Sequence, residues 1–409
     1  MALVTRTFRL GRGGTFWSAA AVLMLCLWSS GAPSVLYPLY AAQWHLPQVV
    51  ITSVFGAYPL ALLVVLLFFG GLSDGIGRRR AMLLGIVFIG LSSVVFALAP
   101  NVGFLFAGRV MQGIGTGVAL GAASAALVEN NTSGNARFPS SLATISTSAG
   151  LALAVFLSGL LAQLAPLPLV LSFAVLFLLS AAAYALTWMT PDDAGAGRPR
   201  WKPQGLHLPG GILRVFIVST LSVSVAYSCG AIFLSLGAQM ARQLTGTTNL
   251  LVIGAVLSTS AVSIGVTALF LSRVHAHLAV VAGGIVSMVA LALMAVAATT
   301  GSLAVLLLWC VVGGIGYSFA FTGGLSLINR TAPASHRGAT LSLLYLFSYL
   351  LQAATAIGAG QLATSLGLDR AMELVAPLVG FLCVAAIVLA VVDLLARRRI
   401  AREAAPVLA

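Results

Sequence analysis

The segment GGLSDGIGRRRAML, residues 70 to 83, holds an unusual concentration of charge. Only 7% of the 409 residues are charged, yet Asp74, Arg78, Arg79 and Arg80 fall within seven consecutive positions between two apolar runs. A carboxylate can bind a helix N-terminus, where unpaired N–H groups favour negative charge, and guanidinium groups pair with carboxylates. We therefore expect a polar cluster that joins helix ends. For Arg80 we expect only a role in orienting the chain.

Three acidic residues further along the chain are candidate partners for the arginines. Glu129 closes one predicted helix, and Asp192 and Asp193 follow another. We expect Arg78 and Arg79 to reach these carboxylates. Asp74 can face the N-terminus of the predicted helix that begins near residue 338.

Arg109 and Gln112 belong to the segment RVMQGIGTG, which lies inside an apolar run. A cation within a membrane span costs ~2.5 kcal/mol on insertion scales and usually faces a cavity or a partner. Two interpretations remain open. Arg109 either takes part in substrate binding and coupling, or is a structural strut capped by backbone carbonyls or by Gln112.

The elements that position these residues are predicted to be membrane-spanning helices. Hydrophobic residues make up 60% of the chain, and continuous apolar stretches of about 20 residues, the length of a membrane-spanning helix, recur along it. The fold class is therefore an all-α polytopic membrane protein. We place the twelve spans at residues 15–40, 47–71, 80–99, 103–128, 139–163, 167–189, 210–236, 247–271, 276–299, 302–328, 338–364 and 371–396.

The net charge of +13 orients the chain in the membrane. With the N-terminus inside, 18 of the 21 basic residues fall on the inner side and only Arg242 and Arg370 fall outside. This asymmetry follows the positive-inside rule, so both termini are predicted to be cytoplasmic. The charge gives no reason to expect a nucleic-acid partner. We expect an integral protein of a bacterial cytoplasmic (inner) membrane.

A polar segment divides the spans into two sets of six. Residues 190–209 are rich in proline, glycine and charge, and are predicted to be a cytoplasmic linker between a bundle at 1–189 and a bundle at 210–396, with a tail at 397–409. At an offset of 201 residues, QGIGTG at 112–117 aligns with GGIGYS at 313–318. Two repeated six-helix halves are typical of secondary transporters.

The charged segment resembles the signature that the major facilitator superfamily carries between its second and third helices, and RVMQGIGTG resembles the family's motif in helix 4. The resemblance implies alternating access, with a latch at the cytoplasmic gate and a coupling or substrate role for Arg109 and Gln112. The residues implied in the latch are Gly70, Asp74, Gly77, Arg78, Arg79, Glu129 and Asp192.

The resemblance also indicates a substrate cavity lined by helices 1, 4, 7 and 10 and their neighbours. Packing or an interfacial aromatic belt is the alternative for each candidate. The candidates are Trp28, Tyr37, Tyr58, Tyr227, Tyr317, Tyr345, Tyr349 and Gln352.

None of the eight acidic residues falls in the middle of a predicted span. We therefore expect neutral or anionic, partly apolar substrates. The first choice is proton-coupled efflux of small amphipathic compounds by a monomer surrounded by lipid. Uptake or facilitated diffusion of a sugar-like or organic-acid metabolite is the alternative. A non-transporting membrane sensor and a membrane-embedded enzyme are the alternatives from other functional classes. No acid, base or metal cluster favours an enzyme, and neither a cofactor nor a metal is expected.

Overall fold

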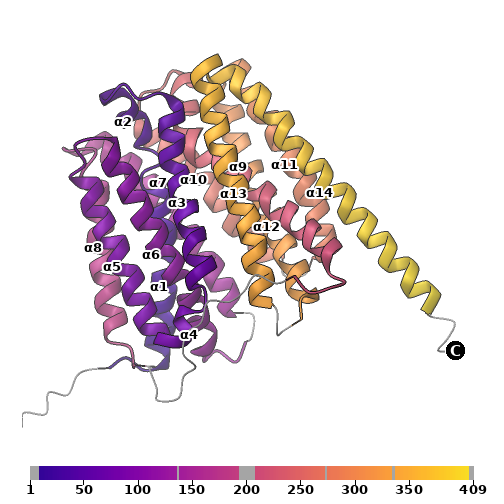
Figure 1. The fold of residues 1–409 in the computed structure, drawn as a ribbon. Helices are drawn as coiled ribbons and strands as arrows, with labels where there is room; N and C mark the ends of the chain where they lie inside the picture. The colour runs from indigo at the N-terminus through magenta and orange to yellow at the C-terminus, as the bar shows by residue number, and fades with distance from the viewer. Residues whose placement is uncertain (1–8, 136–137, 193–207, 272–273, 334–336, 405–409) are drawn as a thin grey trace, which may run out of the picture. The chain divides into compact units, whose positions relative to one another are not determined.

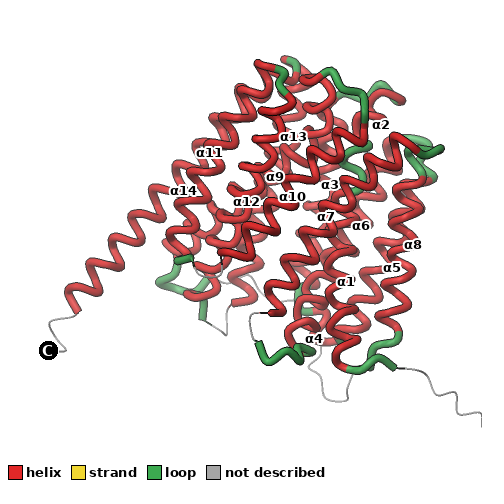
Figure 2. Tube along the Cα trace, turned by 180° about the vertical axis from the view of Figure 1, so that it is seen from behind, coloured by secondary structure: helices red, strands yellow, loops and turns green. Residues whose placement is uncertain are grey.

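The computed structural model describes residues 9–135, 138–192, 208–271, 274–333 and 337–404. These residues form helices joined by short loops, and no strand occurs among them (Figures 1 and 2). The helices are α1 (Arg12–Gly31), α2 (Tyr37–Gln43), α3 (Gln48–Phe69), α4 (Leu72–Ile76), α5 (Arg78–Ala97), α6 (Val102–Glu129), α7 (Phe138–Leu164), α8 (Leu171–Trp188), α9 (Leu213–Thr245), α10 (Leu250–Phe270), α11 (Ala276–Thr300), α12 (Leu303–Thr331), α13 (Arg337–Leu366) and α14 (Leu368–Ala404).

Twelve of the described helices are long and apolar enough to cross a membrane, all except the short α2 and α4. The hydrocarbon of a membrane offers no hydrogen-bond partners, and a helix satisfies its own backbone N–H and C=O groups internally. The expected all-α, twelve-span fold is confirmed.

The first expected span, 15–40, is not one helix. α1 ends at Gly31, a turn follows, and α2 begins at Tyr37. Pro33 lies in this turn and has no N–H to continue an α-helical ladder. Its carbonyl instead accepts from the N–H groups of Leu36 and Tyr37, at 3.0 and 3.1 Å. The break places Tyr37 on a separate short helix.

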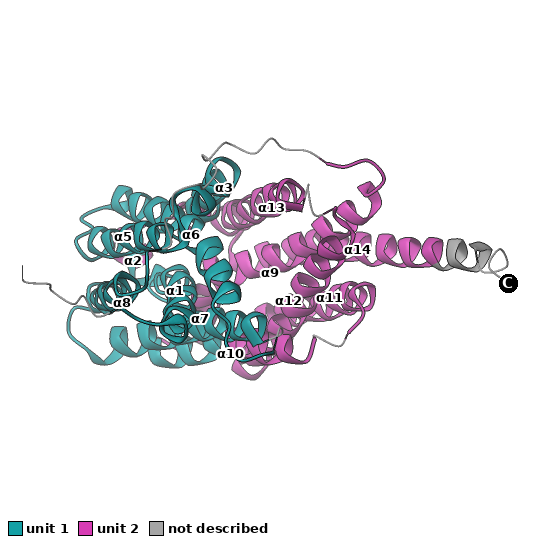
Figure 3. Cartoon of the chain, turned by 90° about the horizontal axis from the view of Figure 1, so that it is seen from below, with its two compact units in different colours: residues 1–40, 57–204, 249–258 teal, residues 41–56, 205–248, 259–409 magenta. Residues whose placement is uncertain are grey.

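The chain forms two compact units (Figure 3). Unit 1 consists of residues 1–40, 57–204 and 249–258, and unit 2 of residues 41–56, 205–248 and 259–409. The predicted boundary at 190–209 lies mostly outside the described residues. The helix α14 continues to Ala404, beyond the predicted start of the tail at 397.

Two helices are divided between the units. The first part of α3 belongs to unit 2, where the Val49 N–H donates to Thr364 Oγ1 of α13 at 2.9 Å. The first part of α10 belongs to unit 1, where the Leu250 N–H donates to Gln163 Oε1 of α7 at 2.8 Å. Each unit therefore includes a helix segment from the other half of the sequence.

Close backbone approach holds α5 against α6 in unit 1. A Cβ atom added at Gly85 would lie 2.5 Å from the Gly115 carbonyl oxygen, and one added at Gly115 would lie 2.7 Å from the Gly85 oxygen. Reciprocal glycines let the two backbones touch, as in other membrane helix pairs. This contact fixes the start of α5, and with it the arginines, relative to α6.

Candidate functional site

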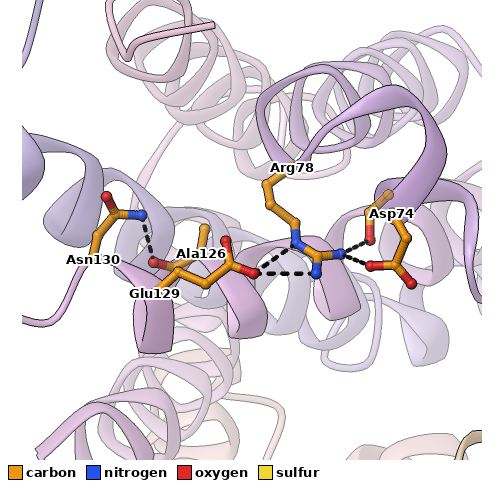
Figure 4. A network of polar contacts seen from close by, with 6 residues as sticks. Asp74, Arg78, Ala126, Glu129 and Asn130 are labelled. Carbon is orange, nitrogen blue, oxygen red and sulfur yellow. Dashed lines mark hydrogen bonds and ion pairs between the residues drawn. The ribbon is translucent and has the colours of Figure 1, made fainter. Parts of the chain in front are cut away.

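Arg78 is the centre of an ion-pair cluster in unit 1 (Figure 4). Its Nη1 lies 2.5 Å from Asp74 Oδ1 and donates to Ser73 Oγ at 2.6 Å. Its Nε and Nη2 donate to Glu129 Oε1 at 3.2 and 3.1 Å. The cluster therefore joins α4, the start of α5 and the end of α6.

Gly77 makes this geometry possible. It separates α4 from α5 with a φ of 100°, which a residue with a side chain rarely adopts. The turn directs Arg78 back toward Asp74, four residues earlier. Gly70, at the end of α3, is also constrained, because a Cβ there would lie 2.6 Å from the Leu66 carbonyl oxygen.

Arg79 and Arg80 connect α5 to the end of α8. Arg79 Nη2 donates to the Trp188 carbonyl at 2.5 Å, and the guanidinium carbon lies 4.9 Å from the Trp188 ring centroid. Arg79 Nη1 is 3.9 Å from Asp192 Oδ2, and Arg80 Nη2 is 3.0 Å from the same oxygen. Arg80 is thus the nearer partner of Asp192, a pairing that was not predicted, and its role in orienting the chain stays a prediction. The candidate Asp193 lies outside the described residues.

These ion pairs are partly open to solvent, which limits the stability that each contributes. The side chains of Arg78 and Glu129 are 21% and 52% exposed, and such pairs typically contribute 0.2–1 kcal/mol. A network of this strength can be broken and re-formed. What it secures is the relative position of α4, α5, α6 and α8 at the arginine-rich end of unit 1.

Arg109 is fully buried within α6. Its Nη1 donates to the Ser30 carbonyl and to Gln112 Oε1, both at 3.0 Å, and its Nε donates to the Tyr37 hydroxyl at 2.8 Å. Its Nη2 also donates to Tyr37. The guanidinium carbon lies 5.4 Å from the Tyr37 ring centroid and 5.8 Å from that of Tyr58. These neutral partners distribute the charge over α1, α2, α3 and α6.

The contacts to the Ser30 carbonyl and to Gln112 are those expected if Arg109 is a structural strut. One detail goes beyond it, because Gln112 is buried and its Nε2 has no hydrogen-bond partner among the described residues. An unsatisfied amide donor beside a buried cation can receive an additional acceptor, such as an anionic or carbonyl-bearing substrate. The predicted candidate Trp28 is buried in α1.

Four of the predicted cavity residues form one aromatic cluster in unit 2. The ring centroid of Tyr227 on α9 lies 4.8 Å from that of Tyr349 on α13 and 6.5 Å from that of Tyr317 on α12. Tyr345 is 5.9 Å from Tyr349. Phe321, which the sequence analysis missed, lies 5.8 Å from both Tyr227 and Tyr317. Its position four residues after Tyr317, on the same helix face, is a signal that could have identified it.

Polar groups border this cluster. The Tyr227 hydroxyl donates to that of Tyr349 at 3.3 Å, and Ser224 Oγ donates to Ser348 Oγ at 3.2 Å. Gln352 is 9% exposed, and its Oε1 has no hydrogen-bond partner among the described residues. It lies three residues after Tyr349 and so shares its face of α13. The arrangement offers ring faces, hydroxyls and a free amide oxygen, all uncharged.

A polar contact that was not predicted from the sequence joins α11 to α14 in unit 2. His277 Nε2 lies 2.8 Å from Asp393 Oδ2, and Arg397 Nε donates to the same oxygen at 2.8 Å. The two partners of Asp393 are 116 and 4 residues away in the sequence. Only the offset of 201 residues, which aligns Asp192 with Asp393, could have indicated this site.

Comparison of the chain with models of known protein families identifies its family. Residues 19–356 match the family model described as Major Facilitator Superfamily. The chain belongs to the Major Facilitator Superfamily. It is a membrane transporter of this family and not an enzyme, so the expected family is confirmed.

Several relatives within the Major Facilitator Superfamily are named for drug resistance. The chain is 41% identical over 68 residues to the multidrug resistance protein D of Escherichia coli K12, a match that spans 17% of each chain. It is 30% identical over 131 residues to the lincomycin resistance protein of Streptomyces lincolnensis, spanning 32% of this chain and 27% of that protein. The puromycin resistance protein pur8 of Streptomyces alboniger is 42% identical over 72 residues, 18% of this chain and 14% of that protein. Each match covers a minor part of the relative's length.

Solved transporter structures share the fold along nearly the whole chain. A POT family transporter in complex with a thioalcohol-conjugated peptide superposes with a TM-score of 0.74 at 14% identity, covering 95% of this chain and 96% of that one. The nucleoside transporter NupG gives a TM-score of 0.72 at 14% identity, covering 92% and 99%. At this identity the likeness concerns the fold of the Major Facilitator Superfamily alone.

Proposed function

We propose that this transporter exports small amphipathic compounds across a bacterial cytoplasmic membrane in exchange for protons. The observation that carries the proposal is the uncharged aromatic cluster of unit 2 formed by Tyr227, Tyr317, Phe321, Tyr345 and Tyr349, with Gln352 beside it. The names of the relatives, which include lincomycin and puromycin resistance proteins, support export.

The aromatic cluster suits flat, partly apolar molecules. Tyr227, Tyr317 and Tyr349 lie well inside α9, α12 and α13 rather than at the helix ends, where interfacial aromatic belts form. Stacked aromatic pairs contribute about 0.5–1.5 kcal/mol beyond the area they bury. The unpartnered Gln352 oxygen can accept a hydrogen bond from a ligand N–H or O–H. Because aromatic rings, hydroxyls and an amide carry no net charge, they cannot neutralise a charged ligand group. The site therefore favours neutral compounds or the apolar part of an anion.

Arg109 supplies the fixed charge in this proposal. An arginine stays protonated at physiological pH, so it does not itself bind and release the proton. A buried positive charge instead attracts an anionic group and favours the deprotonated form of an acid that approaches it. The unpartnered Gln112 Nε2 lies on the residue that accepts from Arg109 and could donate to the same ligand.

The Arg78 cluster is the gate in this proposal. With both termini cytoplasmic, the arginine-rich end of unit 1 faces the cytoplasm, and the Asp74, Arg78 and Glu129 contacts stabilise one state of the alternating-access cycle. We expect the transporter to act as a monomer in the lipid bilayer, since each chain carries two six-helix halves.

Drug susceptibility and vesicle transport together test the proposed function. Expression in a drug-sensitive bacterial host should raise resistance to amphipathic drugs such as puromycin or lincomycin, and everted vesicles should accumulate the drug only when a proton gradient is imposed. Tyr349→Ala and Gln352→Leu should each lower the accumulation. Phe381→Ala, which alters an exposed aromatic residue of α14, is the control. Accumulation of a sugar or organic acid in right-side-out vesicles instead would favour the uptake alternative, and equilibration of a compound across the membrane without a gradient would favour facilitated diffusion.

A further inference from the structure

The cluster of His277, Asp393 and Arg397 forms a buried contact between α11 and α14 in unit 2. The side chain of Asp393 is 8% exposed, that of His277 13% and that of Arg397 45%. Asp393 Oδ2 receives both partners at 2.8 Å. Because an ionised carboxylate only accepts hydrogen bonds, the His277 Nε2 that faces it carries the proton of this contact.

The aspartate of this contact aligns with one that forms an ion pair in the first half of the chain. An offset of 201 residues aligns Asp192 with Asp393, and the same offset aligns QGIGTG with GGIGYS. Asp192 follows α8 and pairs with Arg80 near the start of α5. Asp393 lies near the end of the span in α14 and pairs with His277 near the start of α11. In each half, the sixth spanning helix is thus joined to the third by an aspartate and a base.

The two bases differ in one property. The guanidinium of Arg80 is charged at every physiological pH, whereas an imidazole changes its charge between about pH 5 and pH 8. Protonation of His277 at Nδ1 would leave the Nε2–H bond to Asp393 in place and add a full positive charge. The carboxylate charge already strengthens this hydrogen bond, and a protonated imidazole adds a direct Coulomb attraction between opposite charges.

Few other charges face this contact. α11 packs against α9, α12 and α14, and the charged residues at the same end of α9 and α12 are Arg214 and Arg330. Among the described residues, neither forms an ion pair with Asp393. His275, on α11's own N-cap, is exposed and two residues from His277. When His277 is neutral, the Asp393 carboxylate therefore retains one close cation, the half-exposed Arg397.

We propose that His277 and Asp393 form a proton-binding clamp between α11 and α14, tightened when His277 is protonated and loosened when it is neutral. The clamp makes the second half of the transporter sensitive to pH at a position where the first half is held by a permanent ion pair. It acts whatever the transported compound is, so its test is separate from that of the proposed function.

Hydrogen–deuterium exchange of the purified full-length protein tests the clamp. Exchange times at pH 6 and pH 8 are scaled for the intrinsic pH dependence of amide exchange. The backbone amides in the first turns of α11 and in residues 385–397 of α14 should be roughly tenfold more protected at pH 6, which corresponds to about 1.4 kcal/mol, because the imidazolium adds a Coulomb attraction to the carboxylate.

Three variants assign the effect. His277→Gln keeps an amide donor without charge and should give low protection at both pH values. His277→Arg installs the permanent charge found in the first half and should give high protection at both, which keeps the proposal testable if the glutamine variant fails to fold. His275→Gln should behave as the unaltered protein. Equal protection at the two pH values in the unaltered protein, or a pH response that survives in either His277 variant, would overturn the proposal.

Discussion

At the scale of the single residue, two roles are open for Arg109: a structural strut or a residue that couples transport to protons. It is fully buried and donates to the Ser30 carbonyl, the Tyr37 hydroxyl and Gln112 Oε1. Its removal would leave these three acceptors without their donor, at about 1–3 kcal/mol for each buried group that stays unsatisfied. A loss of stability alone would thus not distinguish the two roles.

Two substitutions of Arg109 separate them. Arg109→Lys keeps the positive charge but loses the planar fork that contacts several oxygens at once, and we expect it to retain some transport. Arg109→Ala should abolish transport while the protein still reaches the membrane. The measurement is the pH dependence of uptake into everted vesicles at equal protein amounts. Normal transport with an unchanged pH profile in Arg109→Ala would leave Arg109 as a strut.

Residue-level prediction from the sequence succeeded where contacts are local or resemble a known motif. The contact of Arg78 with Glu129 and that of Arg79 with Asp192 were expected, because helix ends are visible in the apolar pattern. The pairing of Arg80 with Asp192 was not, since nothing in a run of three arginines shows which one faces α8. The contact between His277 and Asp393 was not predicted, because residues 270–280 carry no run of arginines like the one that marks the first-half contacts.

At the scale of the element, hydropathy predicted the twelve spans but not every helix end. The turn after Gly31 lies within a continuous apolar stretch, so hydropathy alone does not mark it, although Pro33 was a visible signal. The division of α3 and α10 between the two units was also unpredictable. It depends on tertiary contacts such as the bond from Val49 to Thr364, for which a single sequence carries no pattern.

The packing of α5 on α6 gives a prediction at this scale. Gly115→Leu places a side chain where the backbone of α5 passes, with an added Cβ only 2.7 Å from the Gly85 oxygen. Overpacking of this kind costs about 1–3 kcal/mol, so the thermal unfolding midpoint in detergent should fall by several degrees. Gly121→Leu on the same helix is the matched control, because a Cβ there meets nothing within 4 Å. Equal midpoints for the two variants would mean that α5 and α6 can separate without loss.

At the scale of the whole molecule, the gate interpretation of Asp74 makes a claim about the population of two states. Asp74 lies 2.5 Å from Arg78 at the arginine-rich end of unit 1. If this carboxylate stabilises the outward-open state, Asp74→Asn should shift the molecule toward the inward-open state. Half-exposed pairs contribute about 0.2–1 kcal/mol, so the shift in the equilibrium should be about 1.4-fold to fivefold.

Cysteine labelling measures this shift. Single cysteines placed by Ser124→Cys on α6 and Ala339→Cys on α13 lie near the ends predicted to be cytoplasmic, and the side chains of both positions are at least partly exposed. In Asp74→Asn, a membrane-impermeant maleimide should label both faster from the cytoplasmic side in everted vesicles, and no faster from the opposite side in intact cells. The native cysteines Cys26, Cys310 and Cys383 are buried, and the protein without added cysteines supplies the background, including labelling of Cys229. Unchanged rates from both sides would remove Asp74 from the gate and leave the Arg78 cluster as a fixed support of unit 1.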